Sequence, residues 1–450
     1  MSKITELVYP LILLTVFSLL FLFGLGNTIV IDYDEGVYAE VSREMYLEFE
    51  PVIPILNGEE FFEKPPMLYW AQMFGYKLFG TNSLGARFFN ALCGLATVMI
   101  VFFSARIPLG NRSAFNCSLI LGSSFLFVYL SRVAMTDMVL TMFLTITLVS
   151  SWYGVERALR GHSGHVLFWI GCLAAGCAML SKGAIGALFP AVTAGIYLAS
   201  INRIGLLFRK NWLLPGAFIL VAVGFSWYLM LGFQHPDGFG FMKELFMKHH
   251  VGRFSQAMEG HSGPVYFYII VLLLGFLPWF SYLPLAVVHA PVLSSQDPAS
   301  RFIRLFVIFS AVVFIFFSIA ATKLPNYIVP VLPGLSLLTA TLFNRETMKF
   351  PVLWVVGGWL SAILIGLLGV ILATAPFIIS YLPDLLGEDS RKAPILIEPV
   401  QLGYGIWFAA LMFILTSLMI VRTVRKRHIA QMFQTLLLAS FTISATIFFA

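Results

Sequence analysis

Long apolar runs recur along the whole 450-residue sequence. A membrane-spanning α-helix needs about 20 mainly apolar residues, because hydrocarbon cannot satisfy exposed backbone N–H and C=O groups. Windows of that length predict thirteen spans, at residues 8–26, 84–105, 113–131, 134–155, 166–181, 183–200, 212–233, 264–290, 303–321, 325–343, 351–373, 403–421 and 429–449. We therefore expect an all-α polytopic membrane protein.

The composition agrees with a membrane location and excludes other classes. Hydrophobic residues make up 59% of the chain, charged residues 11%, and the mean hydropathy of +0.89 lies outside the soluble globular range. The basic residues cluster in short loops, so no stripe suited to nucleic acid occurs. All four cysteines lie in apolar runs without metal-ligand spacing, which predicts neither a disulfide framework nor a redox centre: Cys93, Cys117, Cys172 and Cys177.

The distribution of charge predicts the orientation of the spans. With Lys3 in the cytoplasm, sixteen of the 28 Lys and Arg residues are cytoplasmic, with only four of the 22 acidic residues, which satisfies the positive-inside rule. The run 8–26 has no small-residue cleavage pattern, so we expect it to remain as a helix. We expect one membrane domain over residues 1–450, without a soluble domain, and a first extracytoplasmic loop at 27–83.

The stretch from Asp32 to Pro66 lies in that loop and holds ten of the 22 acidic residues. So many carboxylates cannot enter hydrocarbon, and we expect the chemistry of the protein here. Apolar residues and glutamates at helical spacing on different faces predict a short interfacial helix: Tyr38, Val41, Met45 and Phe49 against Glu40, Glu44 and Glu48. Prolines and the Asn57-Gly58 turn end it, and Pro65 is well placed to start another helix.

Other polar residues fall at the outer ends of predicted spans, at the level of this loop: Lys64, Arg132, Asp137, Lys182, His249, His250, Arg253 and Lys323. Several have a plain structural explanation. Asp34 could cap a helix N-terminus. Lys64 and Lys323, each next to a proline, could be snorkelling anchors, and Tyr327 could belong to an aromatic belt.

Arg132 and Asp137 could likewise form a structural pair. His249 and His250 could lie on a solvated helix face, and adjacent histidines point to different sides. Taken together, however, several cations near isolated carboxylates suit a lipid phosphate as ligand. A carboxylate could remove a proton from an attacking hydroxyl. This pattern predicts group transfer from a lipid-phosphate carrier.

A series of motifs resembles a known family. The segments DEGVYAEVSREM, PILNG, FEKPPMLYWA, LSKGAIG, HHVGRF and KLPNYIVPVLPGL resemble, in order, motifs of the bacterial aminoarabinose transferases that modify lipid A. These belong to a wider family related to dolichyl-phosphate-mannose protein mannosyltransferases. The resemblance spans the chain and implies a GT-C glycosyltransferase of about 13 transmembrane helices. Such an enzyme takes a sugar from a polyprenyl phosphate on the outer face of the membrane and inverts its anomeric centre.

The resemblance also implies site residues. Asp34 matches the catalytic carboxylate, which would act as base or orient the acceptor. The groups expected to bind the donor phosphate are Lys64, Arg253, Lys182, Lys323 and Tyr327. Polar positions around the cavity are Glu35, Tyr38, Glu63 and Asp137. Some relatives carry a metal near the residue matching Glu63, and His249 or His250 could complete such a divalent-metal site, although no cofactor is expected to be required.

Two departures from the family pattern bear on the substrates. Val37 precedes Tyr38 where Arg is usual, and His249 stands where Glu is usual. The relatives continue into a soluble domain, which is expected to be absent or removed here because the sequence ends at Ala450. The implied activity is transfer of a sugar from undecaprenyl phosphate to lipid A or another envelope glycan at the bacterial inner membrane. The alternatives are a protein O-mannosyltransferase-like enzyme, a polyprenyl-lipid transporter or flippase, and a non-catalytic lipid-binding protein.

Overall fold

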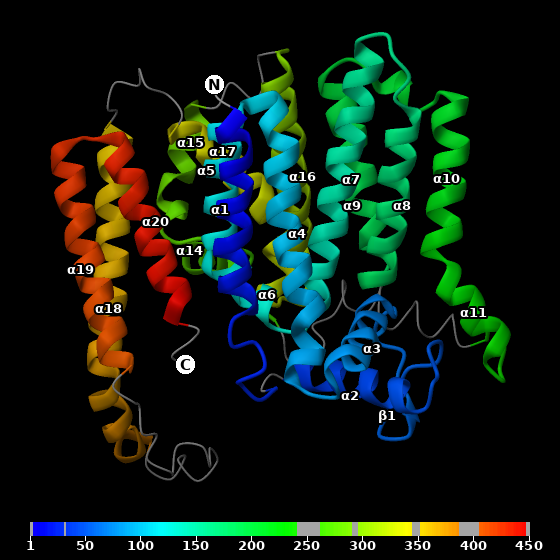
Figure 1. The fold of residues 1–450 in the computed structure, drawn as a ribbon, viewed down its shortest axis with the longest axis horizontal. Helices are drawn as coiled ribbons and strands as arrows, with labels where there is room; N and C mark the ends of the chain where they lie inside the picture. Colours follow the sequence, from blue (N-terminus) through cyan, green and yellow to red (C-terminus); the bar gives the residue numbers. More distant parts are fainter. Residues whose placement is uncertain are drawn as a thin grey trace.

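The computed structural model describes residues 3–30, 33–240, 262–289, 296–343, 352–386 and 405–446. Most helices run side by side, with the N-terminus at one end of the bundle and helices α2 and α3 at the other (Figure 1). The bundle comprises α1 (Lys3–Leu22), α4 (Ser83–Leu109), α5 (Asn111–Ser123), α6 (Phe125–Arg132), α7 (Thr136–Leu159), α8 (His165–Lys182), α9 (Ile185–Ser200), α10 (Lys210–Gly224), α11 (Ser226–Gln234), α14 (Phe267–Gly275), α15 (Leu283–His289), α16 (Pro298–Ile319), α17 (Leu332–Phe343), α18 (Val352–Leu386), α19 (Gly405–Lys426) and α20 (Ile429–Ala445). The described residues between them also form the 3-10 helices η1 (Ile204–Leu206), η3 (Trp279–Tyr282) and η4 (Pro325–Val331).

The apolar helices of the described residues correspond in position to the predicted spans. Seven are long and apolar enough to cross a membrane, and three bent pairs raise that number to as many as ten. Three shorter apolar helices, Leu7–Leu22, Ile185–Ser200 and Ile429–Ala445, account for the other predicted runs. The expectation of an all-α, multi-pass membrane protein is confirmed.

The run predicted as one helix at 113–131 is instead two helices, α5 and α6, bent by 64°. At the break, the Ser124 backbone is extended and its hydroxyl donates to the backbone oxygen of Ile120 (2.6 Å). Hydroxyls of Ser440 and Ser444 on α20 donate to the backbone oxygen of Ser123 (2.8 and 2.7 Å). The backbone oxygen at the bend is therefore hydrogen-bonded by residues remote in sequence, and apolar periodicity cannot reveal such partners.

The first loop forms two helices, as predicted, joined by a small hairpin. Helix α2 (Tyr33–Leu47) buries Tyr38, Val41 and Met45, whereas strands β1 (Ile55–Leu56) and β2 (Glu59–Glu60) form the hairpin before α3 (Met67–Phe79). The expectation that Phe49 continues the apolar face is wrong. The helix has already ended, and Phe49 has a left-handed backbone (φ 54°) and is 87% exposed.

Hydrogen bonds attach the segment between α2 and α3 to its neighbours. The Glu44 carboxylate on α2 accepts from the backbone N–H groups of Asn57 (2.8 Å) and Gly58 (3.3 Å) in the hairpin. The Trp70 indole donates to the backbone oxygen of Pro51 (2.7 Å). The Trp227 indole of α11 reaches the same segment, at the backbone oxygen of Val52 (2.7 Å). These bonds hold the loop beneath the ends of the spans (Figure 1).

Helix α3 packs directly against the start of α4 through glycine. A Cβ atom added at Gly75 would collide with the backbone oxygen of Gly85, so the two backbones can approach this closely only because a side chain is missing. This contact sets the position of α3, and hence of the loop that precedes it.

We expect Gly75→Ala to lower the thermal stability of the purified protein by about 1 to 3 kcal/mol, because the new methyl group overpacks a backbone contact. Gly195→Ala in α9 is the matched control, since a Cβ atom there meets nothing within 4 Å. Thermal unfolding in detergent measures both variants. Equal stability of the two would contradict this account of the α3–α4 contact.

Candidate functional site

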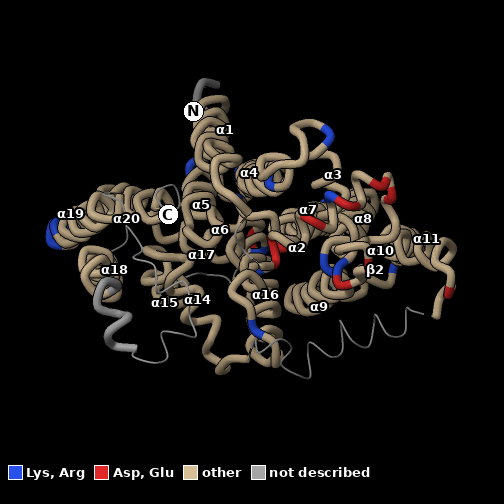
Figure 2. Tube along the Cα trace, turned by 90° about the horizontal axis from the view of Figure 1, so that it is seen from below, with Lys and Arg blue, Asp and Glu red and all other residues tan. Residues whose placement is uncertain are grey.

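Charged side chains gather at the end of the bundle that carries α2 and α3. Viewed from that end, acidic segments lie around α2, α7, α8 and the hairpin (Figure 2). Helices α19 and α20 contain no acidic residue. The candidate site therefore lies on the part of this face formed by the first loop and the ends of α7, α8 and α16.

The ends of α7 and α8 meet in a buried ion pair. The Lys182 ammonium donates to one oxygen of the Asp137 carboxylate, and the Asn326 amide donates to the other at 2.6 Å. The same ammonium lies 4.1 Å from the centre of the Tyr327 ring. Three of the predicted residues are thus brought together: Asp137, Lys182 and Tyr327. Asn326, which precedes Tyr327 in the KLPNYIVP motif, was not among the predicted site residues.

A second group of predicted residues lies around Tyr38 on α2. The ammonium of Lys64 is 5.9 Å from the centre of the Tyr38 ring and 3.7 Å from the Glu63 carboxylate. Lys64 is 7% exposed and Tyr38 4% exposed. Burial raises the pKa of Tyr38 well above its usual value, and the charges of Asp34, Asp137 and Glu63 raise it further. The phenol therefore remains protonated, and it lies within the electrostatic field of three carboxylates.

Glu35, predicted as a cavity residue, has a structural partner. Its carboxylate, 1% exposed, accepts two hydrogen bonds of 2.7 Å from the Arg87 guanidinium and one of 2.8 Å from the backbone N–H of Ala134. Arg87 also donates to the backbone oxygens of Thr28 (3.1 Å) and Ile29 (3.0 Å). The pair joins the segment after α1, the start of α2, the start of α4 and the α6–α7 connection.

Arg87 was not among the predicted site residues, although its position in the sequence carries a signal. A charged residue inside a predicted span, here 84–105, is costly unless it is paired. The Asn90 amide, one turn further along α4, donates to the backbone oxygens of Val133 (2.5 Å) and Met135 (2.8 Å). Helix α4 thus positions both Glu35 and the backbone that leads to Asp137.

The Arg132–Asp137 pair, considered as a structural alternative, does not form. Arg132 donates to the backbone oxygens of Leu20 (3.0 Å) and Phe23 (2.9 Å) near the end of α1, whereas Asp137 binds Lys182 and Asn326. A cation at a helix C-terminus is favourable because several carbonyl groups there lack intrahelical partners. Sequence spacing gave no sign of that partner.

Lys323 uses its ammonium in a similar way. It donates to the backbone oxygens of Ser318 (3.0 Å) and Ala320 (2.5 Å) at the end of α16, and the residue is 6% exposed. The end of this helix is thereby capped. Its predicted contact with the donor phosphate stays a prediction.

Three predicted residues lie outside the described part of the chain: His249, His250 and Arg253. In the described residues, no group of three or more His, Cys, Asp or Glu side chains could hold a metal ion. Of the proposed metal ligands only Glu63 is described, with its carboxylate 3.7 Å from the Lys64 ammonium. The metal site therefore stays a prediction.

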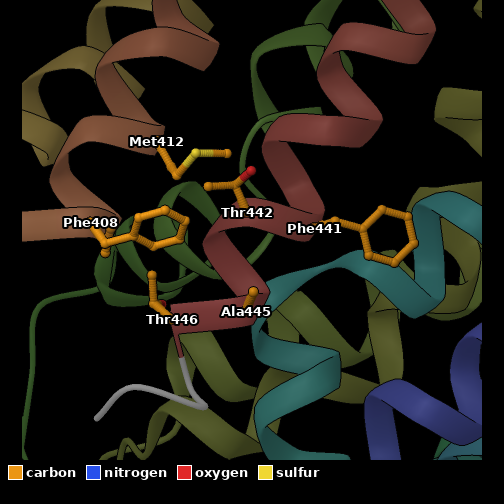
Figure 3. A pocket seen from close by; sticks show the side chains of 7 residues that line it. Phe408, Met412, Phe441, Thr442, Ala445 and Thr446 are labelled. Carbon is orange, nitrogen blue, oxygen red and sulfur yellow. The ribbon is translucent and has the colours of Figure 1, made fainter. Parts of the chain in front are cut away.

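A groove of about 230 Å³ lies elsewhere, between α19 and α20. Its lining is apolar apart from two threonines: Phe408, Ala409, Met412, Phe441, Thr442, Ala445 and Thr446 (Figure 3). None of the described residues that line this groove is ionisable, so they offer neither a general base nor a cation that could bind a phosphate. The charged end of the bundle remains the candidate site.

We expect Arg87→Met to destabilise the protein by about 3 to 5 kcal/mol, because it leaves the Glu35 carboxylate buried without its partner. Arg43→Met is the control. Arg43 forms a two-bond pair with Glu40 on the same helix as Glu35, but its side chain is 42% exposed, so its loss should have little effect. Thermal unfolding measures both variants, and equal melting temperatures for Arg87→Met and Arg43→Met would refute the structural role of Arg87.

Comparison with known proteins identifies the family. Residues 63–230 match the family described as dolichyl-phosphate-mannose-protein mannosyltransferase. An undecaprenyl phosphate-alpha-4-amino-4-deoxy-L-arabinose arabinosyl transferase of Edwardsiella ictaluri is 30% identical over 402 residues, covering 88% of this chain and 70% of that protein. A second such transferase, from Proteus mirabilis, is 30% identical over 72% of this chain and 57% of its own length. An uncharacterised protein of Aquifex aeolicus is 31% identical over 74% of this chain and 63% of its own length.

Solved structures give the same assignment. The crystal structure of ArnT from Cupriavidus metallidurans bound to undecaprenyl phosphate matches 96% of this chain and 76% of its own, with a TM-score of 0.76 and 25% identity. The oligosaccharyltransferase of Archaeoglobus fulgidus, at 14% identity and a TM-score of 0.52, shares the fold alone. The chain spans less than two thirds of the length of the relatives from Aquifex aeolicus and Proteus mirabilis. Its sequence and fold show that it belongs to the aminoarabinose transferase family of GT-C membrane glycosyltransferases.

Proposed function

We propose that this protein is an inverting glycosyltransferase that moves a sugar from a polyprenyl-phosphate carrier to an acceptor outside the cytoplasm. Undecaprenyl phosphate is the proposed carrier, and lipid A or another envelope glycan the proposed acceptor. Two findings support the choice. Its relatives are named for transfer from undecaprenyl phosphate, and the similar ArnT structure contains that lipid.

The observation that carries the proposal is a pair of largely buried ammonium groups, those of Lys64 and Lys182, at one end of the bundle. The Lys64 ammonium lies beside the Tyr38 ring, and the Lys182 ammonium lies beside the Tyr327 ring. The charge of the Asp34 carboxylate acts on Tyr38, so this carboxylate belongs to the same region. Two ammonium groups at one end of the bundle suit a phosphate ligand, because a phosphate accepts strong charge-assisted hydrogen bonds from them. The predicted Arg253 would add a third cation.

The proposed reaction breaks the bond between the anomeric carbon and the phosphate oxygen of the donor. The acceptor oxygen attacks that carbon from the opposite face, and the bonding electrons leave with the phosphate, whose charge Lys64 and Lys182 stabilise. A hydroxyl acceptor must also lose its proton, and Asp34 would accept it. A phosphate acceptor is already ionised, so Asp34 would then orient it.

A lipid transporter or flippase is a less well supported function for the same residues. In the described spans, every Asp, Glu, Lys and Arg lies within about two turns of a helix end. Transport sites usually place ionisable groups near the membrane midplane. The distribution of charge favours chemistry at one membrane surface, which we propose is the extracytoplasmic one.

The decisive test uses purified protein, radiolabelled undecaprenyl-phosphate sugars, and envelope lipids and proteins as acceptors. We expect label transfer by the wild type, a loss of about 100-fold or more with Asp34→Asn for a hydroxyl acceptor, and a loss of about 10- to 100-fold with Lys64→Ala. The exposed residues Glu59 and Lys77 provide the controls Glu59→Gln and Lys77→Ala, which should transfer normally.

Nearly full activity of Asp34→Asn would remove the catalytic role given to that carboxylate. Tight binding of the carrier without transfer, lost only with Lys64→Ala, would instead favour a flippase or a lipid-binding protein. The identity of the labelled product would name the acceptor class.

A further prediction separates the two lysines at span ends. We expect Lys182→Met to weaken undecaprenyl phosphate binding about tenfold or more, because it removes a buried cation from the proposed phosphate site. Lys323→Met should lower thermal stability but leave binding within about threefold, because that ammonium caps α16. The double variant Asp137→Asn with Lys182→Met avoids an unpaired carboxylate and should bind as weakly as Lys182→Met. Equal loss of binding in Lys323→Met would assign Lys323 to the phosphate.

A further inference from the structure

One face of α3 directs three polar side chains toward its neighbours. Tyr69, Gln72 and Tyr76 recur at helical spacing, and all are buried. The Gln72 amide accepts from the Ser42 hydroxyl of α2 (2.5 Å) and donates to a backbone oxygen of α4 (3.3 Å). The Tyr76 hydroxyl donates to a backbone oxygen of α2 (2.9 Å).

Tyr69 is the exception in this row. Its side chain is 0% exposed, yet its hydroxyl has no hydrogen-bond partner among the described residues. Folded proteins pair nearly all buried polar groups, because an unbonded one loses its hydration without compensation. Among the described residues the donor and acceptor capacity of the Tyr69 hydroxyl is thus unused, and it is available to a group from outside the chain.

Tyr69 occupies the end of the row nearest the candidate site. Its ring centroid lies 6.2 Å from that of Tyr38, which in turn lies 5.9 Å from the Lys64 ammonium. Burial raises the pKa of Tyr69, and the charges of Glu63 and Asp34 raise it further. The hydroxyl is therefore a permanent donor, and the neighbouring charges that act on it are carboxylates.

We propose that the Tyr69 hydroxyl hydrogen-bonds a hydroxyl group of the sugar carried by the donor lipid, an inference that rests on the proposed transferase function. A phenol both donates and accepts, and so does a sugar hydroxyl. The carboxylates of Glu63 and Asp34, whose charges act on Tyr69, can accept hydrogen bonds from other hydroxyls of the same sugar. Tyr69 thus contacts the transferred group, whereas Lys64 and Lys182 contact the leaving group.

The test is Tyr69→Phe, which removes one oxygen atom and keeps the packing of the ring. We expect kcat/KM for the polyprenyl-phosphate sugar to fall about tenfold, while the affinity for sugar-free undecaprenyl phosphate stays within about twofold and the melting temperature does not fall. Tyr282→Phe is the matched control. Its hydroxyl is equally buried and without a partner among the described residues, but its ring packs on Trp354 and Phe343. It should behave as wild type in all three measurements.

Normal transfer by Tyr69→Phe, with active wild type, would overturn the inference and leave the proposed function intact. An equal loss of affinity for the sugar-free lipid would place the contact on the phosphate, which also overturns it. If the wild-type protein transferred no sugar from any polyprenyl phosphate, both the proposed function and this inference would be refuted.

Discussion

The geometry of the site depends on one buried ion pair, Glu35 with Arg87. Both carboxylate oxygens are occupied, one of them twice, and the guanidinium also binds backbone oxygens that follow α1. Burying two charges is expensive, and their attraction offsets that cost only when nearly every donor and acceptor is used. Because this pair meets that condition, it fixes the relative positions of four chain segments, which hydrophobic packing alone would not specify.

The position of each candidate residue follows from this anchor. Asp34 directly precedes Glu35, so the pair that fixes the start of α2 also fixes the proposed catalytic carboxylate. The Ala134 N–H bonded to Glu35 lies three residues before Asp137, and Asn90 holds the same connection from α4. The two sides of the site, the Asp34 side and the Asp137–Lys182 side, are therefore set by the same few turns of α4.

The sequence predicted the spans, the interfacial helices and the grouping of Asp137, Lys182 and Tyr327, because these follow from apolar run length, helical spacing and motif order. It could not predict the partners of Arg132 and Lys323, since both bind backbone carbonyl groups, which every residue carries. The bend at Ser124 escaped for a related reason: the hydroxyls of Ser440 and Ser444 that satisfy it lie more than 300 positions away. Hydropathy and motifs report the types of side chain along the sequence. The partners of Arg132 and Lys323 and the bend at Ser124 depend instead on which backbone groups of a distant segment lack a hydrogen bond.

The charged groups of the site bear on how a donor phosphate would bind there. Around Tyr38 and Tyr327 the described groups comprise three carboxylates, Asp34, Glu63 and Asp137, and the ammonium groups of Lys64 and Lys182. The other cations predicted to bind the phosphate, Lys323 and Arg253, would add positive charge. Lys182 is bonded to Asp137 and lies over the Tyr327 ring, so the position of its ammonium is fixed. The Lys64 ammonium lies 3.7 Å from the Glu63 carboxylate, a distance longer than a hydrogen bond. In the proposed reaction the donor phosphate gains charge as it leaves, and Lys64 and Lys182 would stabilise that charge together, while Asp34 would serve the acceptor and Tyr69 the sugar.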